Sequence, residues 1–299
     1  MVITRTTRNR LDGKTFRGFE SHHLRQIFGQ AFLSALLNNI NQHKNKKKGV
    51  KMKRKYSFAG FPVVIDSIYD YVHRQCTDYI FDGEADSEIT IKTSRQDIEN
   101  EREKARANDI IEQSTELDMS DEQLESLAVY RRFCDEISTR GCILIRGCAV
   151  SAYNKAYLFT GDSGVGKSTH ARLWLAHLGS SAEIINGNNP ILRITGDTVY
   201  VYGTPWCGRE GINQNKCIPL NVICILTRDK TNHIEEISIS DGYAQISNQC
   251  YRPANLNYLS NTISNLNRIL KNVKLYSLGC NVEPSAAVVA YEGMKNKVL

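Results

Sequence analysis

The sequence predicts an α/β protein, in which a mixed β-sheet carries helices and follows a small α+β segment. Three observations predict this class. Strand-like and helix-like patterns alternate in the second half of the chain, and a glycine-rich turn at residues 161–166 joins a strand to a helix. The 299 residues are 41% hydrophobic and 23% charged, as in globular proteins. The sequence contains no run of about 18 apolar residues, so we expect no membrane span.

The first 51 residues differ from the rest in charge. They hold 11 Lys and Arg against 2 Asp and Glu, a net charge of +9, whereas residues 52–299 hold 27 against 30, a net charge of −3. We expect residues 1–51 to be a basic tail, either disordered or the product of a mis-assigned start before Met52. A membrane-surface or partner-binding helix at residues 24–37 is the alternative. Because the basic charge belongs to the tail, we expect no nucleic-acid partner for the folded body.

Residues 52–138 predict the small α+β domain. Runs of β-branched and aromatic residues predict strands at 56–66 and 87–92, and charged runs with Leu and Ala predict helices at 96–107 and 120–138. Ser120 and Gln123 have the spacing of a capping box. The segment contains no pattern that indicates chemistry.

Residues 139–299 predict the core with the mixed sheet. Short apolar runs between turn residues predict strands, and longer amphipathic runs predict helices. The expected strands are 142–151, 156–160, 183–186, 191–194, 198–202 and 220–227, and the expected helices are 167–178, 241–250, 255–272 and 284–296.

The nine cysteines are scattered and include no C-x-x-C pair. Several lie in apolar runs, which favours buried free thiols in a reducing compartment over disulfides or a zinc site. The first residues lack the apolar stretch of a signal peptide. We therefore expect a cytoplasmic protein.

The segment AYLFTGDSGVGKST, residues 156–169, combines a strand, the spacing G-x-x-x-x-G-K-S and a helix. Glycines let backbone N–H groups surround a phosphate, and the helix N-terminus adds positive potential. Lys167 is expected to reach the β- and γ-phosphates, and the Ser168 hydroxyl to bind Mg²⁺. The predicted nucleotide-binding residues are Gly161, Asp162, Ser163, Gly164, Val165, Gly166, Lys167, Ser168 and Thr169.

The chain resembles the HPr kinase/phosphorylase and phosphoenolpyruvate carboxykinase superfamily, and is similar to uncharacterised HPr-kinase-like proteins of bacteria. The resemblance spans roughly residues 56–299. It is carried by AYLFTGDSGVGKSTHARLW, NGNNPILR, YGTPWCG and CNVEPSAAVVAYEGM. It implies a P-loop core that binds ATP and Mg²⁺ and a kinase activity. Relatives are often oligomers, so it also implies a possible homo-oligomer.

The resemblance assigns roles at three further positions. Arg209 is expected to cover the transferred phosphate. Asn188 stands where the family has an acid that holds Mg²⁺ or accepts the proton of the acceptor hydroxyl, and an amide cannot act as a base near neutral pH. Arg146 stands where relatives usually have a histidine. The candidate catalytic residues are thus Lys167, Asn188 and Arg209. The candidate metal ligands are Ser168 and Asn188.

Two functions follow from these residues. The first is an ATP-dependent kinase that phosphorylates a hydroxyl of a peptide, a protein or a small molecule. The second is a nucleotide-binding pseudokinase, which the amide at Asn188 favours. Asp162 is the alternative candidate for the role of the missing acid, although its place beside the phosphates suits the metal better.

Three other sets of residues allow two interpretations each. Tyr202 and Trp206 fit either a base or acceptor pocket or a turn packed on the core. Lys216 fits a phosphate contact or a solvated charge. His170 and His177 lie seven apart on the helix after the P-loop, and we expect a surface pair rather than a metal site.

Overall fold

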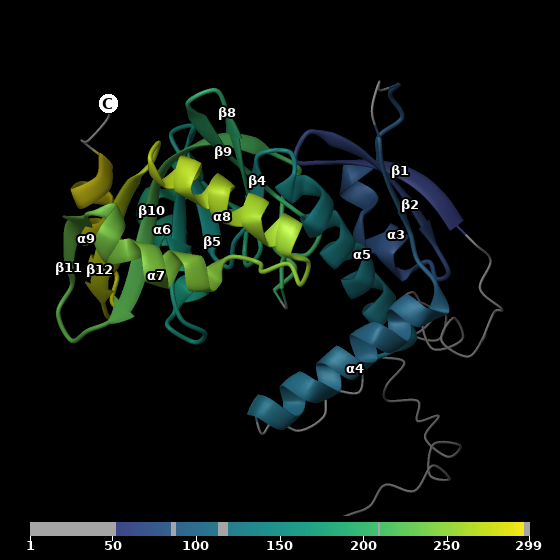
Figure 1. Cartoon of the computed structure of the whole chain (residues 1–299). Coiled ribbons are helices and arrows are strands. Elements are labelled where there is room, and N and C mark those ends of the chain that lie inside the picture. Colours follow the sequence, from purple (N-terminus) through teal and green to yellow (C-terminus); the bar gives the residue numbers. More distant parts are fainter. Residues whose placement is uncertain (1–51, 85–87, 113–118, 209, 296–299) are drawn as a thin grey trace, which may run out of the picture. The chain divides into compact units, whose positions relative to one another are not determined.

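Two β-sheets, one of three strands and one of nine, organise the chain in the computed structural model (Figure 1). The structure describes residues 52–84, 88–112, 119–208 and 210–295, which belong to the compact unit Lys51–Leu299. The mixed sheet with its helices confirms the predicted α/β class. The predictions for residues 1–51 lie outside the described residues, and the predicted boundary near residue 138 stays a prediction.

The small sheet begins with a hairpin that the sequence analysis took for one strand. β1 (Met52–Phe58) and β2 (Phe61–Ser67) are antiparallel, and β3 (Ile89–Lys92) runs parallel to β2. The single strand predicted at 56–66 is therefore wrong. The chain reverses at Ala59 and Gly60, whose φ angles are 52° and 77°, and only glycine adopts such angles without a steric cost.

Helices cover this sheet and lead to the next. They are α3 (Tyr71–Gln75), the short 3₁₀ helix η2 (Thr77–Tyr79), α4 (Arg95–Glu112) and α5 (Asp121–Ser138). The capping box at the start of α5 is confirmed, because Ser120 N–H donates to Gln123 Oε1 at 3.0 Å and Gln123 N–H donates back to Ser120 Oγ at 3.4 Å. Val129 and Phe133 of α5 are fully buried in the core above β1 and β2.

The large sheet has the order β4-β8-β9-β10-β6-β5-β7, with β12 beside β10 and β11 beyond it. Its strands are β4 (Cys142–Leu144), β5 (Cys148–Ala152), β6 (Lys155–Thr160), β7 (Ala182–Asn186), β8 (Ile191–Thr195), β9 (Thr198–Tyr202), β10 (Cys217–Arg228), β11 (His233–Ile237) and β12 (Lys274–Cys280). β10 is parallel to both β6 and β12. The carboxyl ends of these three strands therefore lie on one edge of the sheet.

Two features of this sheet differ from the prediction. The single strand predicted at 142–151 is two strands, because β4 pairs with β8 whereas β5 pairs with β6 and β7. The chain leaves the sheet at residues 145–147 between them. β11 and β12 were not predicted at all, and β12 begins four residues after α8.

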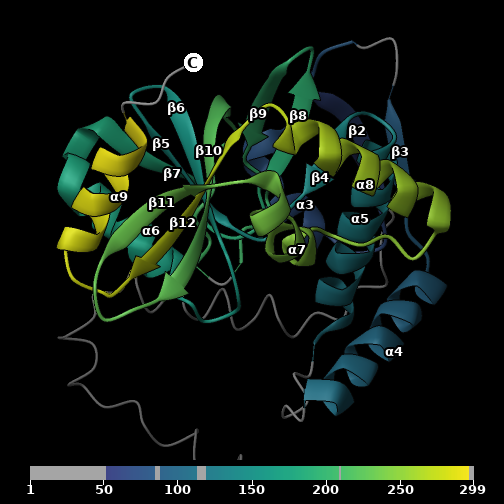
Figure 2. The same cartoon turned by 60° about the vertical axis from the view of Figure 1, so that its left-hand side comes forward.

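Helices cover both faces of the large sheet (Figure 2). α6 (Lys167–Leu178) and α9 (Ser285–Lys295) pack on one face through Trp174, Ala290 and Met294. α7 (Ile239–Gln249) and α8 (Leu256–Leu270) pack on the other through Ile246 and Leu266. No helix within the described ranges is long and apolar enough to cross a membrane.

Trp206, from the segment after β9, packs in the core that β1, β2, α3 and α5 form, here called the N-terminal core. It is 6% exposed and lies against the rings of Phe58, Tyr130 and Phe133, with centroids 5.3–6.0 Å apart. Its indole N–H donates to Ser126 Oγ of α5 at 3.2 Å. The aromatic contacts thus fix residues 203–208 against α5.

Trp206→Ala should lower the free energy of unfolding by about 3–5 kcal/mol, because it removes a large buried side chain and leaves a cavity. Leu256→Ala, at a position 78% exposed, is the matched control and should change stability by less than about 0.5 kcal/mol. Urea denaturation of both variants measures the difference. Equal effects would show that Trp206 does not anchor the segment.

Candidate functional site

The loop from β6 to α6 has the backbone that the glycine pattern predicts. Gly161, Gly164 and Gly166 have φ angles of 137°, 77° and 112°, a region that other residues seldom adopt. A Cβ on Gly161 would also lie 2.8 Å from the Leu226 carbonyl oxygen of β10. The loop therefore depends on glycine both for its conformation and for the close approach of β6 to β10.

Lys167 begins α6 and folds back over the loop. Its Nζ donates to the carbonyl oxygens of Gly161 and Asp162 at 2.8 and 2.9 Å. Burial lowers the pKa of Lys167, and the charge of Arg146 lowers it further. The ammonium group is thus held at the loop, beside a second cation.

The other predicted loop residues line the same turn. Val165 N–H donates to the Asp162 carbonyl at 3.2 Å, and the Val165 side chain packs against the core under α6. Asp162, Ser163 and Thr169 are exposed, and Ser168 is half-buried. The structure therefore brings these residues together on one loop.

Two further cationic side chains approach the loop. Arg146 is exposed in the connection between β4 and β5, and its carbonyl accepts a hydrogen bond from Thr160 Oγ1, the residue before Gly161, at 2.7 Å. Arg228 ends β10 and donates to the Gly164 carbonyl at 2.5 Å. Arg146 is predicted from the sequence but Arg228 is not, because only the pairing of β10 with β6 brings Arg228 to the loop.

The segment NGNN at residues 186–189 forms a turn built on buried Asn186. Its Oδ1 accepts the N–H groups of Asn188 and Asn189 at 2.9 and 2.7 Å, and its Nδ2 donates to the Thr204 carbonyl at 3.0 Å. The Asn188 carbonyl accepts the Gly147 N–H at 2.8 Å, which places Asn188 next to the connection that carries Arg146. The Asn188 side chain has no hydrogen-bond partner among the described residues.

The segment from Gly203 to Lys216 passes close to both Asn188 and α6. A Cβ on Gly208 would lie 2.9 Å from the Asn188 Cβ. Two residues further on, the Glu210 carboxylate pairs with Arg172 of α6 at 3.0 Å. Arg209, predicted to cover the transferred phosphate, lies outside the described residues. Glu210 is not predicted from the sequence, because it belongs to no motif and only follows the segment YGTPWCG by two residues.

Two of the alternatives left open by the sequence are decided by burial and pairing. Trp206 packs in the core as described above, so it does not line an open pocket. Lys216 forms an ion pair with Glu183 at 2.6 Å and is exposed, which makes it a paired surface charge.

The expectation that His170 belongs to a surface pair is wrong. His170 is 2% exposed, under α6 and against Phe159, with ring centroids 4.7 Å apart. Trp174 Nε1–H donates to its Nε2 at 3.1 Å, so the neutral ring carries its proton on Nδ1, which has no partner. Burial lowers the pKa of His170 to about 4. The described residues contain no group of three His, Cys, Asp or Glu that could hold a metal ion.

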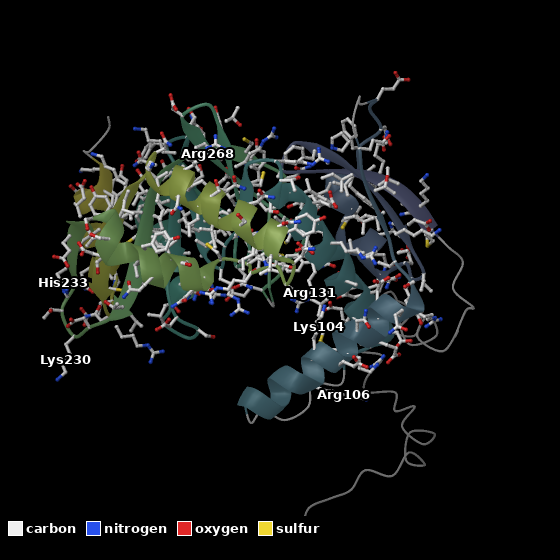
Figure 3. The ribbon with its side chains drawn as sticks, viewed as in Figure 1. Lys104, Arg106, Arg131, Lys230, His233 and Arg268 are labelled. Atoms are coloured by element: carbon white, nitrogen blue, oxygen red, sulfur yellow. The ribbon has the colours of Figure 1, made fainter. Side chains whose placement is uncertain are left out.

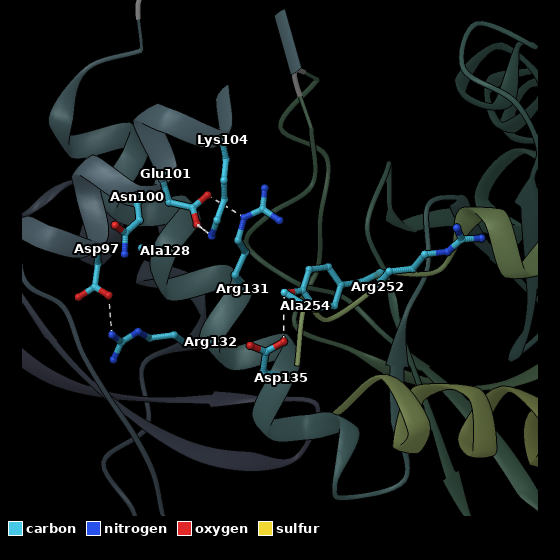
Figure 4. A pocket seen from close by; sticks show the side chains of 11 residues that line it. Asp97, Asn100, Glu101, Lys104, Ala128, Arg131, Arg132, Asp135, Arg252 and Ala254 are labelled. Carbon is cyan, nitrogen blue, oxygen red and sulfur yellow. Dashed lines mark hydrogen bonds and ion pairs between the residues drawn. The ribbon is translucent and has the colours of Figure 1, made fainter. Parts of the chain in front are cut away.

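A separate cavity of about 280 Å³ lies between α4, α5 and residues 251–254. Figure 3 shows Lys104 and Arg131, which line it, well apart from Lys230 and His233 near β11. Five of its charged side chains form ion pairs, which Figure 4 marks with dashed lines: Glu101 binds Lys104 and Arg131 at 2.7 Å each, and Asp97 binds Arg132. Arg252 donates to Asn248 Oδ1 at 2.7 Å, and Asp135 accepts from the Tyr251 hydroxyl at 3.1 Å, so each charged side chain that lines the cavity already has a partner.

The chain matches no protein-family model and no curated protein sequence. Among solved structures, it is similar to the Hpr(Ser) kinase/phosphatase from Coxiella burnetii, with 6% sequence identity and a TM-score of 0.31. The match covers 50% of this chain and 95% of that chain. A similarity of this size does not decide the function.

The His170 pKa predicts acid destabilisation. The unfolded chain binds a proton at His170 below its ordinary pKa of 6.5, whereas the native state resists protonation down to about 4. The stabilisation is thus complete above pH 6.5 and is lost as the pH falls toward 4, by about 3 kcal/mol. Urea denaturation of wild type and His170→Gln at pH 7 and pH 4.5 should give a smaller pH dependence in the variant. Equal pH dependences would contradict the buried neutral ring.

Proposed function

We propose that this chain is an ATP-dependent phosphotransferase that binds Mg-ATP at residues 161–169 and phosphorylates a hydroxyl group. The observation that carries the proposal is the loop between β6 and α6, where three glycines with positive φ angles stand before a helix that begins with Lys167. Such a loop directs backbone N–H groups and the helix N-terminus toward an anion.

The charges around the loop favour a polyphosphate. Lys167, Arg146 and Arg228 all approach it, and the first and last of these donate hydrogen bonds to loop carbonyls. A triphosphate would offer these cations stronger acceptors than the carbonyl oxygens do, because charge-assisted hydrogen bonds are about twice as strong as neutral ones.

The proposed reaction is a transfer of the γ-phosphoryl group. A bond forms between the acceptor oxygen and the γ-phosphorus while the bond from that phosphorus to the β,γ-bridging oxygen breaks. ADP leaves with the electron pair, and the proton of the acceptor hydroxyl passes to solvent water. Mg²⁺, when bound, would neutralise charge on the β- and γ-oxygens, and the Ser168 hydroxyl fits its coordination. The chain's own contribution is to position the phosphates and to stabilise their charge through Lys167 and the loop N–H groups.

A second candidate is a nucleotide-binding pseudokinase with little turnover. The amide of Asn188 favours it, since it stands where the resemblance expects a carboxylate. Release of ADP from Mg-ATP, measured with and without serine-containing peptides and small alcohols, separates the two candidates. Nucleotide binding without release under all conditions would establish the pseudokinase.

The proposal also covers the cellular compartment and the oligomeric state. Free cysteines, eight of them buried or half-buried, fit a reducing cytoplasm, and a homo-oligomer is proposed by analogy with the resembling family. The hydroxyl acceptor is proposed to be a peptide, a protein or a small molecule.

Lys167→Ala should weaken Mg-ATP binding at least about 10-fold while leaving the melting temperature within a few degrees of wild type. The change removes charge-assisted contacts worth about 1.5–3 kcal/mol, and the native side chain lies on the loop surface rather than in the core. Calorimetric titration with Mg-ATP measures the affinity. Lys271→Ala, an exposed lysine at the end of α8, is the matched control and should bind as wild type does. Unchanged affinity in Lys167→Ala would refute nucleotide binding by this loop.

A further inference from the structure

Glu210 lies against the face of α6 that carries Ser168. Its partner Arg172, at 3.0 Å, is four residues after Ser168, and residues four apart share a face of a helix. The Glu210 carboxylate thus pairs with a side chain on the helix face that carries the hydroxyl which the proposed function directs toward the metal.

The charge of the same carboxylate acts on a residue of the strand next to the phosphate loop. Cys148, at the start of β5, pairs with Phe159 of β6, two residues before Gly161. Burial raises the pKa of the Cys148 thiol to about 12, and the charge of Glu210 adds to the rise while those of Lys167 and Arg172 oppose it. The charges of Glu210 and Lys167 therefore both affect the pKa of the buried Cys148 thiol, which belongs to the strand paired with the end of β6.

The segment that carries Glu210 is fixed from two sides. Asn213 at its far end accepts a hydrogen bond from Tyr79 of the N-terminal core at 2.8 Å. On the other side, Gly187 N–H donates to the Ile212 carbonyl at 2.9 Å, next to Asn188. Gly208 and Ile212, which lie two residues before and after Glu210, thus contact Asn188 and its neighbour Gly187, although 22 positions separate Glu210 from Asn188 in the sequence.

We propose that Glu210 is the carboxylate ligand of the divalent cation in the proposed nucleotide site, in place of an acid at position 188. The inference rests on the proposed function and deepens it. Mg²⁺ takes oxygen ligands and is commonly bound through one or two protein oxygens together with nucleotide phosphates and waters. Ser168 and Glu210 offer one hydroxyl and one carboxylate, which fits that pattern. Arg172 neutralises the carboxylate while no cation is bound.

The test measures metal affinity directly. Mn²⁺ is titrated by electron paramagnetic resonance into the full chain saturated with the non-hydrolysable β,γ-imido analogue of ATP. Glu210→Gln should weaken Mn²⁺ binding at least about 10-fold, the range found when metal sites lose a supporting group. Binding of the analogue in EDTA should stay unchanged, because the loop and Lys167 remain.

Three variants separate a metal ligand from a structural ion pair. Arg172→Gln removes the same ion pair but leaves the carboxylate free, so it should keep or strengthen Mn²⁺ binding. Glu183→Gln removes an exposed carboxylate paired with Lys216 at 2.6 Å and should have no effect. Asn188→Asp in the Glu210→Gln background should restore much of the lost Mn²⁺ affinity, since it returns a carboxylate to a residue that Gly208, two positions before Glu210, approaches closely.

Two results overturn the assignment of Glu210. One is wild-type Mn²⁺ affinity in Glu210→Gln, and the other is an equal loss in Arg172→Gln and Glu210→Gln, which would make the pair structural. If the wild-type chain does not bind the analogue with or without metal, the proposed function falls together with the assignment. Analogue binding in EDTA therefore distinguishes the two failures.

Discussion

The close approach of β6 to β10 at Gly161 is the constraint on which the candidate site depends. The Leu226 carbonyl leaves no space for a side chain at this position, and the φ angle of 137° suits glycine alone. From this point the chain turns through two more glycines into α6. The same parallel pairing brings Arg228 to the Gly164 carbonyl, so one strand pair fixes the loop and one of its cations.

A second constraint acts on the segment from Gly203 to Lys216, which connects the N-terminal core to the loop region. Trp206 is buried among aromatic rings of that core, and Gln75 Nε2 donates to the Pro205 carbonyl at 3.2 Å. The three-stranded sheet and α5 thus position a segment whose other side lies against Asn188 and α6. This gives the N-terminal part a role that its own sequence does not indicate, because it holds residues near the candidate site.

The charges at the loop are mostly positive, and the placement of acids decides what chemistry is possible. The Asn188 side chain is an amide, which offers an oxygen ligand but no carboxylate. In the metal site that we propose, the carboxylate comes from a different segment, through Glu210, which pairs with Arg172 of α6. A missing acid at one sequence position therefore does not establish a missing acid in the site.

The sequence alone determined the features that depend on local patterns: the α/β class, the glycine-rich turn with Lys167 and Ser168, the capping box at Ser120 and most strands of the large sheet. It did not determine the break at Ala59, the split of 142–151 into two strands, or β11 and β12, since these depend on which strands pair rather than on the run itself. Nor did it determine the burial of His170 and Trp206 or the meeting of Glu210 with Arg172. Residues far apart in the sequence make those contacts, and only packing brings them together.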